Sequence, residues 1–181
     1  MRGLLPRDQG FVVVAESFSG PIAIRLAADP PPGLQGVILV ATFAASPTRI
    51  PAGLLRPLLP SLVLAPAPGW PITRLLLGFS PPESLCTALL QAIHSVEPAV
   101  LHHRIVEVLE VDVTPQLRRA AVPLRYLRAA QDRVVPARCG KLVARLVPKL
   151  EPITIPGPHL LLQREAQAAA TVIIDQGPRT A

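Results

Sequence analysis

The sequence predicts an α/β protein in which helices flank a mostly parallel sheet. Short runs of β-branched and other apolar residues, such as residues 37–40, occur between stretches with helical spacing. Such runs are typical of strands that are buried on both faces of a parallel sheet. In addition, residues 11–40 follow the order strand, sharp turn, helix, strand, which is the βαβ unit that joins parallel strands.

The first strand is expected from Phe11 to Val14, a continuous apolar run that we expect to be buried on both faces. Residues 21–28 have the apolar spacing of a helix that packs on a sheet. Residues 29–33, Asp-Pro-Pro-Pro-Gly, end this helix because proline donates no amide hydrogen and keeps the residue before it out of the helical conformation. The second strand is expected at residues 37–40.

The middle of the chain has no strand pattern. Prolines and leucines are frequent up to Pro82, and helices are expected at residues 83–96 and 98–111. This pattern differs from that of both flanking parts of the chain, so residues 46–114 are interpreted as an insertion of helices into an α/β core.

Strand and helix patterns alternate again in the last third of the chain. The expected elements are a strand at residues 122–130, an amphipathic helix at 137–147, a strand at 151–155 and a helix at 161–174. We therefore predict a core whose two halves are residues 1–45 and 115–181.

The composition excludes several classes of protein. The chain has 181 residues with a net charge of +6, and 50% of its residues are hydrophobic. This apolar content is sufficient for one core and excludes a disordered chain. The most apolar stretch, residues 54–70, is interrupted by Arg56 and several prolines, so we expect no membrane span. Residues 1–8 leave no room for the apolar region of a signal peptide, which predicts a soluble, cytoplasmic protein.

Cysteines and charges exclude further kinds of site. Cys86 and Cys139 are too few for a disulfide framework or a metal site, and as buried thiols they fit a reducing compartment. The arginines are scattered and aromatics make up only 3% of the chain, so no nucleic-acid partner is expected. His103 and Glu107 have the i, i+4 spacing of metal ligands, but no third ligand falls in register, so no metal is expected.

Ser17 is the candidate nucleophile. It follows a strand and precedes a helix, with Ala15 and Ser19 at the flanking offsets and Gly20 next. A chain that doubles back within a few residues needs small neighbours, and such a turn projects the hydroxyl above the carboxyl edge of the sheet. The Phe18 amide would then face the oxygen that becomes negative during acyl transfer. A serine that only caps the helix is the alternative.

Asp132 and His159 are the candidate acid and base. Asp132 follows the strand at residues 122–130, and His159 follows the strand at 151–155 through a Pro-Gly-Pro loop. The carboxyl ends of parallel strands meet at one edge of a sheet, which brings both residues to the edge that carries Ser17. The chain order Ser, Asp, His is that of a hydrolase triad on an α/β sheet. An aspartate that caps a helix and an ordinary loop histidine are the alternatives.

With these motifs the sequence resembles the α/β-hydrolase superfamily. The resemblance spans most of the chain and rests on three stretches: Ala15-Glu16-Ser17-Phe18-Ser19-Gly20, Gln131-Asp132-Arg133-Val134-Val135-Pro136 and Ile155-Pro156-Gly157-Pro158-His159-Leu160. It implies a serine hydrolase that acts on an ester, thioester or related acyl bond without a cofactor. It also implies that residues 46–114 form a helical cap. Glu16 departs from the histidine that often precedes the nucleophile in this family.

One part of the family's pattern is absent from the sequence. Family members have about four strands before the strand that carries the nucleophile, and the loop after the third of them supplies a second oxyanion amide. Only ten residues precede Phe11, and they contain no His-Gly motif. The resemblance therefore implies a chain truncated at its N-terminus and impaired in activity. It also leaves Phe11 to Val14 as an exposed apolar strand along which another chain can pair.

The middle segment supplies the expected substrate pocket. Trp70, Leu76 and Phe79 are candidates for an apolar acyl pocket, and packing of the cap on the sheet is the alternative. The predicted function is hydrolysis of a carboxylic ester or similar acyl bond in a small molecule. An acyltransferase and a non-catalytic, partner-binding remnant of such an enzyme are the alternatives.

Overall fold

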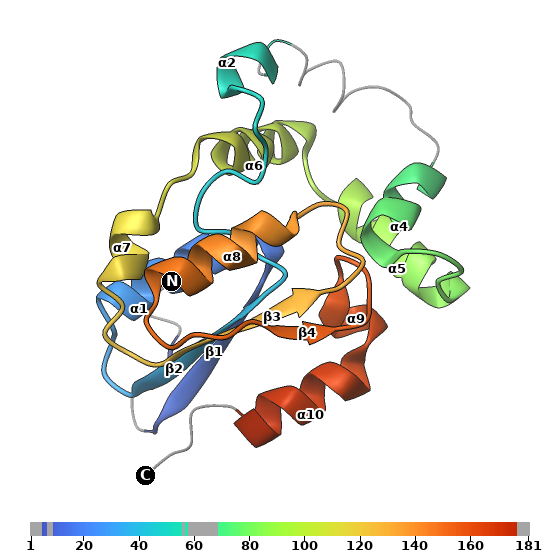
Figure 1. The fold of residues 1–181 in the computed structure, drawn as a ribbon. Helices are drawn as coiled ribbons and strands as arrows, with labels where there is room; N and C mark the ends of the chain where they lie inside the picture. The colour runs from blue at the N-terminus through green and yellow to red at the C-terminus, as the bar shows by residue number, and fades with distance from the viewer. Residues whose placement is uncertain (1–4, 7–8, 56, 58–68, 177–181) are drawn as a thin grey trace.

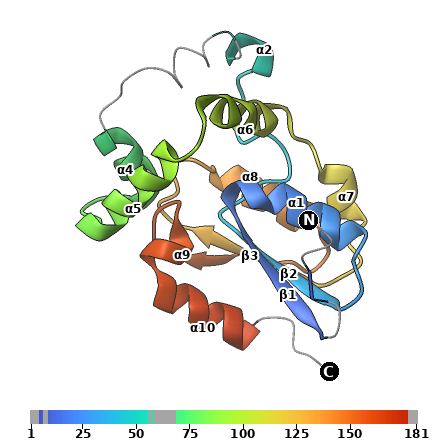
Figure 2. The ribbon, with the colours of Figure 1, turned by 180° about the vertical axis from the view of Figure 1, so that it is seen from behind.

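A single parallel sheet organises the fold. The computed structural model describes residues 5–6, 9–55, 57 and 69–176, and within them four strands pair in parallel in the order β1-β2-β3-β4. Helices lie on both faces of this sheet (Figures 1 and 2). The predicted fold class is therefore confirmed. The strands are β1 (Phe11–Glu16), β2 (Leu34–Val40), β3 (Leu124–Ala129) and β4 (Ile153–Ile155).

The central strand β2 is buried on both faces, as its apolar run predicts. Side chains alternate along a strand, so Val37 and Leu39 face one layer while Ile38 and Val40 face the other. All four are at most 1% exposed. This burial accounts for the continuous apolar run at residues 37–40, because every position of such a strand contacts a core.

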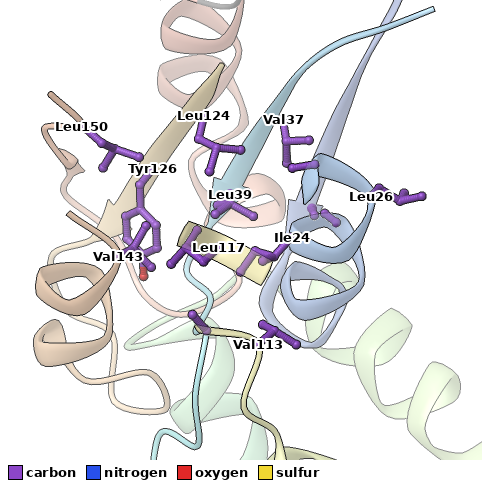
Figure 3. Packing of buried hydrophobic residues seen from close by; sticks show 14 of the residues in the cluster. Ile24, Leu26, Val37, Leu39, Val113, Leu117, Leu124, Tyr126, Val143 and Leu150 are labelled. Carbon is purple, nitrogen blue, oxygen red and sulfur yellow. The ribbon is translucent and has the colours of Figure 1, made fainter. Parts of the chain in front are cut away.

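Three helices cover the first face of the sheet. They are α1 (Gly20–Ala28), α7 (Thr114–Arg118) and α8 (Ala137–Leu146). Figure 3 shows the cluster they form with the strands, in which Ile24 and Leu117 lie near Leu39. The opposite face is covered by α9 (Leu161–Arg164) and α10 (Ala166–Gln176), which contribute Leu161 and Ala169 to a second cluster.

Strand β1 lies at an edge of the sheet. It pairs with β2 from Phe11 to Glu16, and no other described strand pairs with it. The burial on both faces that the apolar run of Phe11 to Val14 suggests is therefore wrong, whereas the exposed edge strand that the family resemblance implies is found. Phe11 is only half-buried and Val14 is 42% exposed, because a strand with one neighbour is covered less completely.

Among the described residues, four helices lie beyond the carboxyl ends of the strands (Figures 1 and 2). Two of them, α5 and α6, begin where the sequence predicts and end one or two residues early. The predicted division into two core halves and a cap stays a prediction. The helices are α2 (Ala52–Leu55), α4 (Gly69–Leu77), α5 (Glu83–His94) and α6 (Pro98–Glu110).

Helices α2 and α4 lie in a stretch where no individual helix was expected, and two further features of the helices differ from the predictions. The short helix α7 was not expected, because five residues are too few to show a period, although Leu117 is 1% exposed in the core. The single helix expected at residues 161–174 is divided into α9 and α10 at Glu165, whose φ of −123° and ψ of 42° are not helical. The apolar spacing continues across this break, so the sequence pattern does not reveal it.

Part of the apolar stretch at residues 54–70, and most of the N-terminal residues 1–8, lie outside the described residues. Among the described residues, no single helix is long and apolar enough to cross a membrane. Helices α5 and α6 reach the length and composition of a span only as a pair, and the chain bends by 99° between them.

Candidate active site

Ser17 lies in a strained turn at the carboxyl end of β1. Its φ is +54°, in the left-handed region that costs energy for any residue with a side chain. The turn is a short 3₁₀ helix, η2 (Ser17–Ser19), that leads directly into α1. Gly20 is required by close approach, because a Cβ at this position would lie 1.9 Å from Thr42 Oγ1. The glycine that the sequence places after this turn thus meets a steric need.

The Ser17 hydroxyl forms a hydrogen bond with His159 at the carboxyl edge of the sheet. Ser17 Oγ lies 2.7 Å from His159 Nε2, although 142 positions separate the two residues. His159 follows β4 and is only 2% exposed. The next residue fixes this loop, because the Leu160 amide donates to the carbonyl of Leu76 in α4 at 2.9 Å. Neither η2 nor α1 has a side-chain cap, so Ser17 does not act as the capping serine of the alternative interpretation.

Asp132 faces the other nitrogen of the same imidazole. Its Oδ2 lies 2.9 Å and its Oδ1 3.1 Å from His159 Nδ1. Oδ1 also accepts hydrogen bonds from the amides of Val134 and Val135, each at 2.8 Å. These two bonds hold the carboxylate in place in the turn before α8. The alternative of a helix-capping aspartate is not what the structure has, because α8 begins after Pro136 without a side-chain cap.

The arrangement selects one tautomer of His159. A carboxylate next to Nδ1 favours the proton on that nitrogen, which leaves the lone pair of Nε2 facing the Ser17 hydroxyl. The His159 side chain is 2% and the Asp132 side chain 4% exposed, so water does not compete strongly for these bonds. In this arrangement His159 can take the proton of Ser17, and Asp132 can stabilise the imidazolium that results.

Thr42, which was not predicted as a site residue, stabilises the turn that carries Ser17. This residue is fully buried, and its hydroxyl donates to the Ser17 carbonyl at 2.5 Å. The Tyr126 hydroxyl donates in turn to the Thr42 carbonyl at 2.6 Å, and burial raises the pKa of Tyr126 above its ordinary range. Tyr126 therefore stays a neutral donor. No sequence motif marks this contact, because Thr42 and Tyr126 are 84 positions apart.

Glu16 also has a contact that the sequence did not reveal. Its Oε1 accepts a hydrogen bond from the Leu162 amide at 2.9 Å. That amide lies in α9, directly after the loop that carries His159. The carboxylate next to Ser17 thus links the turn of the candidate nucleophile to the segment of the candidate base.

The remaining predicted site residues are Phe18, the candidate oxyanion donor, and the three residues of the expected acyl pocket. Phe18 lies in the first turn of η2, where a helical amide has no acceptor within the helix, so its N–H stays the candidate oxyanion donor. Trp70 is 67% exposed, and Leu76 is half-buried. Phe79 is 56% exposed and lines a pocket of about 370 Å³. The predicted acyl pocket of these three residues stays a prediction.

In the part of the chain that the structure describes, no group of three or more metal-ligating side chains comes together. Cys86 and Cys139 are both free thiols, and burial raises the pKa of Cys139.

Solved structures of other proteins match the chain over most of its length. A hydrolase from Pseudomonas aeruginosa matches 91% of this chain at 20% sequence identity with a TM-score of 0.74. A thermophilic esterase from Thermogutta terrifontis matches 92% at 19% identity with a TM-score of 0.75. An enol-lactonase from Burkholderia xenovorans matches 90% at 15% identity with a TM-score of 0.65.

This chain has the α/β-hydrolase fold. It spans only 63 to 64% of the length of these three α/β-hydrolase structures. Its sequence matches no protein-family model and no curated protein. At these levels of identity the likeness establishes the fold, and the chemistry must be argued from the side chains.

Proposed function

We propose that this protein is a serine hydrolase that cleaves a carboxylic ester or a similar acyl bond. The observation that supports the proposal most directly is the pair of hydrogen bonds that join Asp132 to His159 and His159 to Ser17. The backbone of Ser17 is in a strained, left-handed conformation. Strained residues persist where the surrounding structure holds them, and they cluster at active sites.

In the proposed reaction, Ser17 Oγ attacks the carbonyl carbon of the substrate while His159 Nε2 takes its proton. Asp132 holds the imidazole and stabilises its positive charge. The Phe18 N–H donates to the oxygen that becomes negative. His159 then returns the proton to the leaving group, and a second cycle with water releases the acid. In an acyltransferase, another acceptor would replace that water.

A fluorophosphonate probe tests this proposal directly. The probe reacts with serines that a neighbouring base activates, so we expect one equivalent to label the folded protein and peptide mapping to locate it on Ser17. The heat-denatured chain, in which His159 and Ser17 are separated, is the control and should not be labelled. Absence of labelling in the folded protein would contradict the proposal.

Activity should fall as the solution is acidified. Protonation of His159 Nε2 removes the lone pair that takes the proton of Ser17, so kcat/KM is expected to decline on the acid side of a profile measured between about pH 5 and pH 9. Circular dichroism over the same range controls for unfolding. A flat profile with the fold retained would contradict a histidine base.

The Glu16 contact predicts a smaller effect on the same activity. Glu16→Ala removes the acceptor of the Leu162 amide and loosens the segment that follows His159, so we expect kcat/KM to fall about tenfold, the value of one charge-assisted hydrogen bond. Glu16→Gln keeps an oxygen at this position and should retain most of the activity. Glu151→Ala, at an exposed glutamate, is the matched control. Equal rates for Glu16→Ala and Glu16→Gln would show that the acceptor does not matter.

One observation favours a second candidate, pairing with another chain along β1. Strand β1 has a partner on one side only among the described strands, and Val14 is exposed there. Unpaired strand edges recruit further strands. Size-exclusion chromatography distinguishes the two candidates, because a monodisperse 19.3 kDa monomer would contradict pairing with a second copy.

A further inference from the structure

A pocket lined by arginines lies beside the candidate acid and base. Its volume is about 370 Å³, and its walls come from α4, α9 and the loops that follow β3 and β4. Figures 1 and 2 show these elements side by side at the carboxyl end of the sheet. Its charged and polar lining residues, together with one aromatic ring, are Arg74, Phe79, Gln131, Arg133, Arg164 and Glu165. We call it the arginine pocket.

Two guanidinium groups of this pocket converge on one aromatic ring. The Cζ of Arg74 lies 3.7 Å from the centroid of the Phe79 ring, and the Cζ of Arg133 lies 5.1 Å from it. The two guanidinium carbons are therefore no farther apart than the sum of these distances. Cation–π attraction holds each group over the ring, but it does not neutralise either charge.

Neither of these two arginines has an acidic partner among the residues that the structure describes. Of the acidic residues nearby, Asp132 pairs with His159. Glu165 lines the same pocket without pairing with either arginine. Arg164 differs, because its guanidinium donates to the carbonyls of Leu77, Phe79 and Ser80 and is thus committed to the backbone.

Gln131 adds a neutral donor to the two charges. Its Oε1 accepts a hydrogen bond from the Gly157 amide, which orients the side chain and leaves its NH₂ group to donate. The arginine pocket therefore combines two arginines that form no ion pair among the described residues with an amide donor. Planar guanidinium groups bind carboxylate and phosphate oxygens in pairs, which makes such a set complementary to an oxyanion.

We propose that Arg74 and Arg133 bind a carboxylate or phosphate group in the arginine pocket. Gln131 and Arg133 flank Asp132 in the sequence, and Pro158 precedes His159, so the bound anion lies next to the candidate catalytic residues. If the anion belongs to the substrate, the protein hydrolyses acyl compounds that also carry an acidic group. That second statement rests on the proposed function, whereas anion binding itself does not.

Titration with inorganic phosphate tests the anion site without requiring activity. We expect the melting temperature of the full chain to rise saturably with phosphate at constant ionic strength set with NaCl. The Arg74→Met/Arg133→Met double variant should bind phosphate more weakly, with an apparent Kd at least tenfold larger. Methionine keeps an apolar side chain over Phe79 and removes the charge and the N–H donors of the guanidinium. Arg145→Met, at an exposed arginine on α8, is the matched control and should behave like the wild type.

Lysine variants guard against a loss of folding. Arg74→Lys/Arg133→Lys keeps both charges, so this variant should bind phosphate more tightly than the methionine pair does. Ser17→Ala should bind phosphate like the wild type, which separates this test from the proposed function. The same apparent Kd in the wild type and in a folded methionine variant would overturn the anion site.

Two esters then distinguish the source of the anion. If it belongs to the substrate, kcat/KM for 4-nitrophenyl hydrogen succinate should exceed that for the neutral 4-nitrophenyl butyrate about tenfold, and the double methionine variant should lose this preference. If phosphate binds but the two esters react equally, the site takes a free anion and the substrate assignment is overturned.

Discussion

Ser17→Ala is expected to reduce kcat/KM for a neutral ester such as 4-nitrophenyl butyrate by about 10⁶-fold. The substitution removes the oxygen that lies 2.7 Å from His159 Nε2, and with it the nucleophile of the proposed reaction. His159 and Asp132 stay in place, but they have no nucleophile to activate. Initial rates at substrate concentrations well below KM measure the effect.

The control for this experiment is Ser95→Ala. Ser95 lies at the end of α5, and its hydroxyl donates only to the Ala92 carbonyl of the same helix. We expect this variant to keep full activity and full labelling by the fluorophosphonate probe. A folded Ser17→Ala protein that retains one tenth or more of the wild-type rate would exclude Ser17 as the nucleophile.

Asp132→Asn is expected to lower kcat by about 10⁴-fold while leaving the fold intact. Oδ1 of Asp132 accepts the amides of Val134 and Val135, so the asparagine oxygen keeps that position. Its NH₂ group then occupies the position of Oδ2, 2.9 Å from His159 Nδ1. A donor at this position forces the imidazole proton onto Nε2, and the base can no longer accept the proton of Ser17.

The melting temperature distinguishes an effect of Asp132 on the tautomer of His159 from an effect on the stability of the fold. The melting temperature of Asp132→Asn should stay close to that of the wild type, because both backbone hydrogen bonds are retained. Asp175→Asn, at an exposed aspartate in α10, is the matched control and should change neither quantity. If Asp132→Asn unfolds the protein, or if its kcat equals that of the wild type, the carboxylate does not act through the tautomer of His159.

The parts of the site that the sequence predicts share one property. Ser17, Asp132 and His159 each lie within four residues of the end of a strand, and strand ends are visible in the sequence because apolar runs stop there. Parallel strands bring all such ends to one edge, so the fold class alone predicts that the three residues are neighbours. The structure brings them within hydrogen-bonding distance.

Contacts that depend on side-chain direction were not predictable in this way. Glu16 bonds to an amide 146 positions away, and Thr42 supports Ser17 across 25 positions. Likewise the guanidinium groups of Arg74 and Arg133 both lie over the ring of Phe79. None of these pairs follows a period or a motif, since each depends on how two separate elements pack against each other.

The sequence by itself determined the parallel sheet, the order of its elements and the three residues at its carboxyl edge. Local chemistry is sufficient for these features, because hydrophobic periodicity, proline and glycine act over a few residues. Only the tertiary structure decided the division of the last helix at Glu165 and the convergence of two arginines on Phe79. Burial and side-chain contacts are set by neighbours that are distant in the chain, and no local pattern records them.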